Sequence, residues 1–156
     1  MKQIQIDEII NMLTITDDQG TLLSIQKGKK QKDHPFYHEL ESYLKQERVT
    51  FTVDYQLEED LSPFTLKVLE AISAIPYGET KTYQAIANAI GHPKASRAVG
   101  NVCAKNKLLF LIPCHRVVGK NSLGAYQLGE EVKAALLQLE HKKTHRSELD
   151  ILSGGE

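Results

Sequence analysis

The sequence predicts an α+β fold, with a small α/β lobe over residues 1–56 and a mainly helical domain over residues 57–156. Three observations support this division. Alternating, β-branched segments occur in the first third of the chain, whereas apolar residues at helical spacing dominate from Ser62 onward. Residues 1–60 hold twelve acids and seven bases, while residues 81–129 hold seven bases and no acid. Such a basic segment attracts a polyanion, although a surface that merely balances an acidic lobe is the alternative.

Composition excludes several classes of protein. The 156 residues are 41% hydrophobic, as in an ordinary globular protein, and no apolar stretch is long enough to span a bilayer. The first residues lack a signal-peptide core, so we expect a cytoplasmic protein without a membrane partner. Cys103 and Cys114 are too few for a disulfide framework, and neither belongs to a CxxC pair typical of zinc sites. We therefore expect no metal.

Strand signals come first along the chain. Leu13–Thr16 and Thr21–Ile25 flank the turn-rich Asp17–Gly20, which predicts a β-hairpin. Apolar residues at helical spacing predict a helix over Phe36–Gln46. The alternating, β-branched Val49–Val53 predicts another strand, and a linker then leads to the helical domain.

Capping signals predict the helices of the second domain. Ser62 before Pro63 combines an N-cap residue with a proline at the first helical position. A second helix over residues 82–90 should end at Gly91, and a third should run from residue 93 to 104. These two short helices with a tight turn resemble a helix-turn-helix, although helical hairpins of this kind are common. A last helix is expected over residues 130–141.

The third helix presents two different faces. Ala95, Val99 and Val102 form the predicted core face. The opposite face combines small and basic residues that would let a helix approach a nucleic-acid groove, although a solvated face is the alternative. Its candidate DNA contacts are Lys94, Arg97, Ala98, Gly100 and Asn101.

A nucleophile candidate follows this helix. The apolar Leu108–Ile112 predicts a buried strand-like segment, which ends at Pro113 and delivers Cys114, His115 and Arg116. Cationic or imidazole neighbours raise the thiolate fraction of a cysteine, as nucleophilic attack requires. Burial as a small hydrophobe is the alternative for Cys114 and the expected role of Cys103.

A partner for His115 is also needed. In an extended chain Cys114 and His115 would point to opposite sides, so cooperation requires a turn or a bridging water. Glu140 lies at the edge of the apolar stripe of the last helix, where an inward orientation would bring it to the histidine. A solvated glutamate near a helix end is the alternative.

Several separated motifs resemble one family in sequence and in order. The segment Ile112–Val118 is similar to the active-site signature of the methylated-DNA–protein-cysteine methyltransferases. The resemblance covers about residues 60 to 142, and its other motifs are Ile75–Thr80, Thr82–Tyr83, Arg97–Gly100, Gly124–Tyr126 and Leu136–Glu140. It departs from the family at Lys105 and Lys107, which flank Asn106 where glycine and proline are common, and at Gln127, where serine or arginine is common.

The resemblance implies a DNA-repair activity. The protein would move the alkyl group of O(6)-alkylguanine, with O(4)-alkylthymine as a further substrate, irreversibly onto Cys114 in one turnover. His115 would act as base through a water, and Glu140 would orient His115. Asn106 would be a hinge, and Tyr83 would help to turn out the nucleotide and polarise the base. The partner would be double-stranded DNA with alkylated guanine, bound by a monomer. No cofactor would be needed, because the alkyl group comes from the DNA itself.

Further implied roles concern DNA contact and the alkyl pocket. Arg97 would fill the gap left by the flipped nucleotide, in keeping with the need to expose a target atom inside a duplex. The other implied DNA contacts include Tyr83 and Arg116. Pro113, Val117, Tyr126 and Gln127 would line the base and alkyl pocket. The N-terminal lobe would be ribonuclease H-like.

Three rival functions were weighed against the sequence. A non-catalytic alkylated-DNA-binding protein of the alkyltransferase-like type usually has tryptophan at the acceptor position, whereas this chain has Cys114 and no tryptophan. A thiol hydrolase would need an oxyanion hole, for which no signature exists. A helix-turn-helix regulator normally shows a dimerisation element, and none is visible.

Overall fold

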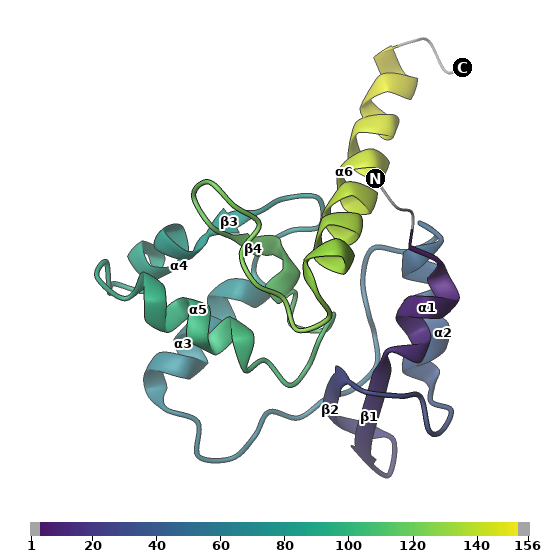
Figure 1. Ribbon diagram of the computed structural model, residues 1–156, viewed down its shortest axis with the longest axis horizontal. Coiled ribbons are helices and arrows are strands. Elements are labelled where there is room, and N and C mark those ends of the chain that lie inside the picture. Colours follow the sequence, from purple (N-terminus) through teal and green to yellow (C-terminus); the bar gives the residue numbers. More distant parts are fainter. Residues whose placement is uncertain (1–3, 153–156) are drawn as a thin grey trace.

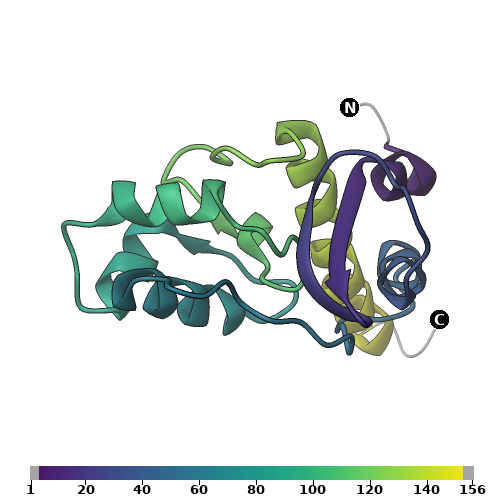
Figure 2. The same cartoon turned by 90° about the horizontal axis from the view of Figure 1, so that it is seen from below.

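The computed structural model describes the backbone of residues 4–152 and the side chains of residues 4–144. The N-terminal elements lie at one end of the molecule and α3, α4 and α5 at the other, with α6 between them (Figures 1 and 2). The observed mixture of helices and strands agrees with the predicted α+β class. No helix in this described part of the chain is long and apolar enough to cross a membrane.

The N-terminal lobe is built on one hairpin and two helices. Its elements are α1 (Ile6–Asn11), β1 (Leu13–Asp18), β2 (Thr21–Lys27) and α2 (Pro35–Leu44). The predicted hairpin is confirmed, and its two-residue turn has positive φ at both Gln19 and Gly20, as in the type I′ turns that match strand twist. The predicted second helix is confirmed as α2, which ends two residues earlier than expected.

The predicted strand over Val49–Val53 is wrong. The carboxylate of Glu39 accepts the backbone N–H groups of Thr52 and Val53 at 2.8 and 3.3 Å, and so replaces a neighbouring strand. The side chain of Phe51 stacks on Phe36, with ring centroids 5.8 Å apart. The alternating pattern therefore reflects packing of an irregular segment, and the ribonuclease H-like topology of the lobe stays a prediction.

The C-terminal helices follow the predicted caps. They are α3 (Pro63–Ser73), α4 (Tyr83–Ala89) and α5 (Ser96–Ala104), and the Oγ of Ser62 accepts the Thr65 N–H at 3.1 Å as an N-cap. Gly91 adopts φ +81° after α4, as expected of a helix terminator. The predicted start of the third helix at residue 93 is wrong, because Ala95 N–H closes a separate turn onto His92 O at 2.9 Å. Lys94 therefore precedes α5.

The apolar Leu108–Ile112 is a turn and not the predicted strand-like segment. Phe110 has φ +72°, and Ile112 N–H donates to Leu108 O at 2.9 Å. Leu108 pairs with Ile25 of β2 in a single isolated bridge. This compact turn leads into a short 3₁₀ helix, η1 (Cys114–Arg116), and into β4 (Val117–Val118), which pairs in parallel with β3 (Lys81–Thr82).

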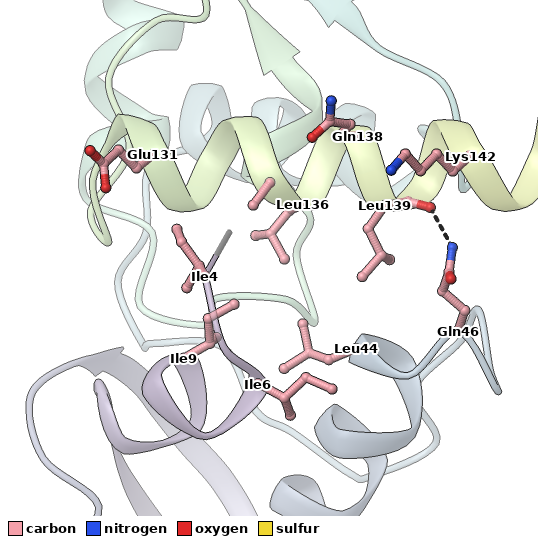
Figure 3. Close-up of a pocket in the computed structure, with 11 residues that line it drawn as sticks. Ile4, Ile6, Ile9, Leu44, Gln46, Glu131, Leu136, Gln138, Leu139 and Lys142 are labelled. Carbon is pink, nitrogen blue, oxygen red and sulfur yellow. Dashed lines mark hydrogen bonds between the residues drawn. The ribbon is translucent and has the colours of Figure 1, made fainter. Parts of the chain in front are cut away.

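The last helix joins the two ends of the molecule. It is α6 (Glu130–Leu152), longer than the predicted residues 130–141. A groove of about 540 Å³ separates it from α1 and the end of α2, and is lined by apolar side chains such as Ile6, Leu44 and Leu139 (Figure 3). Gln46 spans this groove and donates its Nε2 to Leu139 O at 3.1 Å.

Candidate active site

Cys114 begins the 3₁₀ turn between the apolar segment and β4. Its N–H donates to Ile112 O at 2.7 Å, and the residue is 4% exposed. The turn places Cys114 and His115 on a helical rather than an extended backbone, so the two side chains are not forced to opposite faces. The β3–β4 pair holds Tyr83, the first residue of α4, beside this segment.

Asn106 contacts the thiol directly. Its Nδ2 donates to Cys114 Sγ at 3.2 Å and to Ile112 O at 2.9 Å, while its Oδ1 accepts the Leu108 N–H at 3.0 Å. Burial raises the pKa of the Cys114 thiol, and the hydrogen bond from Asn106 and the charge of Lys133 act in the opposite direction. The thiol is therefore buried but has a donor that favours its ionised form.

His115 and Glu140 form a buried pair. Each is 1% exposed, and His115 Nε2 lies 2.8 Å from Glu140 Oε2. A carboxylate partner requires the proton on Nε2, which leaves Nδ1 as the acceptor of a neutral ring. Nδ1 is buried, and none of the described side chains or backbone groups hydrogen-bonds to it. The ring is thus oriented with its basic nitrogen unused by the protein.

Glu140 is the centre of a larger network. Gly78 N–H donates to Oε1 at 3.2 Å, and Arg116 donates to both carboxylate oxygens at 2.8 and 3.0 Å. Burial alone raises the pKa of Glu140, but hydrogen bonds and charge from His115 and Arg116 outweigh it and lower the pKa to about 2. Burial lowers the pKa of His115, with Glu140 opposing that shift. At neutral pH the network holds an ionised carboxylate and a neutral imidazole.

Arg116 does not occupy the place expected of a DNA contact. Its side chain is 11% exposed, and besides Glu140 it donates to Ile75 O at 2.9 Å. A guanidinium in water would be free to meet phosphate, whereas this one neutralises a buried carboxylate. The DNA contact of Arg116 stays a prediction, and in this structure its guanidinium is an internal counterion of Glu140.

Sequence reasoning missed two members of the site. Tyr43 of α2 donates its hydroxyl to Glu140 Oε2 at 2.5 Å, across 97 residues. Lys133 is buried and donates its Nζ to Val117 O at 2.7 Å and to Ala125 O at 3.3 Å. A signal existed for Lys133, because it lies seven residues before Glu140 and so on the same face of α6. No local pattern connects Tyr43 to Glu140.

Two tyrosines lie near the thiol, and a glycine packs against one of them. Tyr126 has its ring centroid 6.3 Å from that of His115, and burial raises its pKa well above the usual value. Its hydroxyl is buried and has no hydrogen-bond partner among the described residues. Gly124 has φ +78°, and a Cβ there would overlap the hydroxyl of Tyr83, so only glycine admits this approach. Pro113 and Val117, also predicted for the pocket, are both buried beside Cys114.

The predicted DNA contacts lie together on and before α5. Lys94, Arg97 and Asn101 are exposed, and Ala98 and Gly100 are partly buried between them. The core face of α5 is formed by Val99 and Cys103, with the predicted Ala95 and Val102 only partly buried. Gly100 faces the Tyr83 ring, because a Cβ built there would lie 3.8 Å from it.

Two remaining predictions concern Cys103 and Gln127. Cys103 is the buried small residue that was expected, and burial raises its pKa to about 12. Gln127 is partly buried and uses its side-chain amide for protein contacts with Lys27 N–H and Asn106 O. Within the described side chains, no cluster of three or more His, Cys, Asp or Glu residues is arranged to hold a metal ion.

Comparison with known proteins gives one consistent result. The model of the 6-O-methylguanine DNA methyltransferase, DNA binding domain, matches residues 63–142. A probable methylated-DNA–protein-cysteine methyltransferase of Acanthamoeba polyphaga mimivirus is 44% identical over 82% of this chain and 87% of its own length. A methylated-DNA–protein-cysteine methyltransferase of Methanosarcina acetivorans is 39% identical over 83% of this chain and 90% of its own length. The crystal structure of Mycobacterium tuberculosis OGT in complex with DNA has a TM-score of 0.75 at 32% identity, covering 84% of this chain and 87% of that one.

Proposed function

The chain belongs to the methylated-DNA–protein-cysteine methyltransferase family, and we propose from this premise that it repairs DNA by moving an alkyl group from O(6) of guanine onto Cys114. The transfer is a single irreversible turnover, so the protein is both catalyst and acceptor. The observation that carries the proposal is the buried Cys114 thiol, hydrogen-bonded by Asn106, in the turn that also delivers His115 to Glu140.

The reaction begins with loss of the thiol proton. His115 takes this proton on Nδ1, through a bridging water, and Glu140 stabilises the imidazolium. The thiolate sulfur attacks the alkyl carbon, so that the S–C bond forms as the C–O(6) bond breaks. The electron pair of the C–O(6) bond passes to the guanine, which takes up one proton from water while the thiol proton remains on His115. The Tyr83 hydroxyl polarises the base during this change. Asn106 N–H supports the developing thiolate.

The buried groups around Glu140 affect whether His115 can hold a proton. Burial disfavours an imidazolium at His115, and the ionised Glu140 opposes this effect through its charge and its hydrogen bond at 2.8 Å. Arg116 keeps that carboxylate ionised, and Tyr43 and Gly78 N–H satisfy its remaining lone pairs. A preorganised network of this kind does not reorganise when the proton moves.

The DNA partner is duplex DNA with an alkylated guanine, bound by one monomer. In this proposal α4 and α5 act as a helix-turn-helix, and Arg97 takes the place of the nucleotide that is turned out of the stack. Lys94, Ala98, Gly100 and Asn101 face the backbone or groove, with the small residues allowing close approach. Support comes from the DNA-binding family model and from the DNA complex of the mycobacterial relative.

The turned-out base enters a pocket beside Cys114. Pro113, Val117, Tyr126 and Tyr83 provide its walls, and Gln127 lies at its edge. The catalytic domain extends over residues 57–156, and the lobe of residues 1–56, which we expect to be ribonuclease H-like, contributes Tyr43 to the network.

The proposal is tested by intact-protein mass after incubation with DNA containing O(6)-methylguanine. We expect a gain of one methyl group per molecule, located on the peptide that contains Cys114, and no further turnover. Repeated cycling at substoichiometric protein would contradict the single-turnover mechanism. Binding without any mass gain would favour the alternative of a non-catalytic lesion-binding protein, which the presence of Cys114 argues against.

A further inference from the structure

One side-chain amide joins the N-terminal hairpin to the segment before the acceptor cysteine. Gln127 lies in the loop between β4 and α6, 100 residues beyond Lys27 at the end of β2. Its Oε1 accepts the Lys27 N–H at 2.8 Å, and its Nε2 donates to Asn106 O at 3.2 Å. Both polar ends of the amide are therefore used in contacts within the protein.

The contact reaches the thiol through a single residue. Asn106 is 4% exposed, and its side chain already bonds Cys114 Sγ, Ile112 O and Leu108 N–H. The direction of Nδ2 therefore depends on where the backbone of Asn106 is held. Gln127 hydrogen-bonds to the carbonyl of Asn106. The carbonyl of the next residue, Lys107, accepts the N–H of Ile25 in β2 at 2.6 Å. Lys105 and Lys107 lack the locked φ of proline, so the backbone beside Asn106 is held by hydrogen bonds and not by ring geometry.

Taking the proposed alkyl transfer as given, we propose that Gln127 is a positioning residue that holds Asn106 with its N–H on Cys114 Sγ, using the edge of the N-terminal hairpin as anchor. A hydrogen bond to a thiolate lowers the free energy of the charged form, which burial disfavours. Loss of the anchor lets Asn106 move and raises the fraction of neutral thiol at neutral pH. The N-terminal lobe thereby affects the reactivity of a cysteine in the other domain.

The test compares three variants of the full chain. Gln127→Met removes both polar groups at nearly constant size, and Asn106→Leu removes the donor to sulfur. Gln138→Met is the matched control, because Gln138 is exposed on α6. The rate of Cys114 alkylation by iodoacetamide is measured against pH, with the modified peptide identified by mass. This reaction forms an S–C bond, releases iodide and needs no DNA.

We expect Gln127→Met to shift the midpoint of this pH profile upward by about half a unit to one unit, and to slow reaction at neutral pH by about 3- to 10-fold. Gln138→Met should leave the profile unchanged. In the Asn106→Leu background, Gln127→Met should add almost nothing, because the two residues act in series. If Asn106→Leu does not fold, faster hydrogen exchange at residues 105–112 of Gln127→Met is the corresponding expectation.

An unchanged midpoint in Gln127→Met would overturn the inference, whatever that variant does to repair. Full additivity with Asn106→Leu, or unchanged hydrogen exchange if that variant cannot be used, would overturn it as well. Single-turnover transfer from O(6)-methylguanine DNA is measured on the same proteins. If wild type transfers no methyl group but Gln127→Met still shifts the iodoacetamide profile relative to wild type, the proposed function is refuted. The link from Gln127 to the thiol is then upheld.

Discussion

The buried network around Glu140 and the exposed face of α5 use charge in opposite ways. In the network, His115, Arg116 and Glu140 are 1 to 9% exposed, and each carboxylate oxygen has more than one donor. On the face of α5, Arg97 is exposed, as is Lys94 just before the helix. Among the described residues, no ion pair is found to either of these two cations. The charges of the network are buried, whereas those on the face of α5 are exposed to water.

In the proposed function, the buried charges act on the transfer step and the exposed charges act on DNA binding. Charges removed from water interact strongly at short range and shift pKa values, as the pKa of about 2 for Glu140 illustrates. Exposed charges contribute little to folding and act on a polyanion at long range, with strong dependence on salt. Changes in the network should therefore alter the rate of transfer at saturating DNA, whereas changes on α5 should alter binding and base exposure.

The largest effect is expected for Cys114→Ala. Without the sulfur no S–C bond can form, so methyl uptake measured by intact mass should be abolished. Affinity for duplex DNA, measured by fluorescence anisotropy, should be unchanged, because Cys114 is 4% exposed and far less accessible than the basic face. Cys103→Ala is the control and should retain transfer, because burial raises the Cys103 pKa to about 12. Methyl uptake by Cys114→Ala would show that another residue is the acceptor.

Next in size is the effect of Glu140→Gln on rate. Loss of the carboxylate removes stabilisation of the His115 imidazolium, so single-turnover transfer at neutral pH should slow by roughly 10²- to 10⁴-fold. The rate should recover partly as pH rises, because hydroxide can then ionise the Cys114 thiol, whose pKa burial raises. The pH profile is compared with those of His115→Ala and of Glu130→Gln, an exposed change on the same helix. Wild-type rates in Glu140→Gln would show that the buried carboxylate does not assist transfer, and that it is no more important to the rate than an exposed charge.

The same carboxylate should make stability depend on acid. Its pKa is lowered from 4.5 to about 2, so its contribution is complete above pH 4.5 and is lost as pH falls towards 2. The linkage amounts to about 3 kcal/mol. His115 acts in the same direction from higher pH, because burial lowers its pKa and the unfolded chain binds the proton first. Urea unfolding of wild type between pH 7 and 3 should show this loss, and a flat profile would contradict the network.

A smaller and more selective effect is expected for Arg97→Ala. Filling the stack matters only where a base must be turned out, at a cost of a few kcal/mol. Transfer from duplex DNA should therefore fall by roughly tenfold or more, while transfer from the free O(6)-methylguanine base should remain at the wild-type rate. Lys67→Ala, an exposed change on α3, controls for loss of one positive charge. Equal losses on both substrates would place Arg97 in the chemistry and not in recognition.

The smallest effect is expected for Lys94→Ala. A single phosphate contact should weaken binding uniformly across DNA sequences and reduce the slope of log affinity against log salt by about 1. Binding titrations at several salt concentrations provide this slope, with Lys29→Ala of the N-terminal lobe as the control. An unchanged slope in Lys94→Ala would limit the DNA-binding face to α5 itself.

Local sequence signals succeeded where a residue's state depends on its neighbours in the chain. The Ser62–Pro63 cap, Gly91 and the hairpin turn are local backbone choices, and all three were predicted. The place of Glu140 beside the apolar stripe of α6 left both an inward and a solvated position open; the family resemblance favoured the inward one, which the structure shows. The motifs around Cys114 likewise indicated the family before any fold was known.

Failures occurred where a distant side chain supplied a partner. Glu39 satisfies the backbone at Thr52 and so removes the need for a strand, and the Leu108 bridge to Ile25 is too short to make one. Likewise, no local pattern indicated that Arg116 would pair with Glu140.

The sequence by itself thus indicated the candidate nucleophile, several helix caps and the basic character of residues 81–129. Only the tertiary structure decided which polar groups are buried in contact with one another. Tyr43 meets Glu140 across 97 residues, and Gln127 meets Lys27 across 100. The physical reason is that capping and periodicity act over one or two helical turns, whereas the cost of burying a polar group is met by any donor that folding brings near.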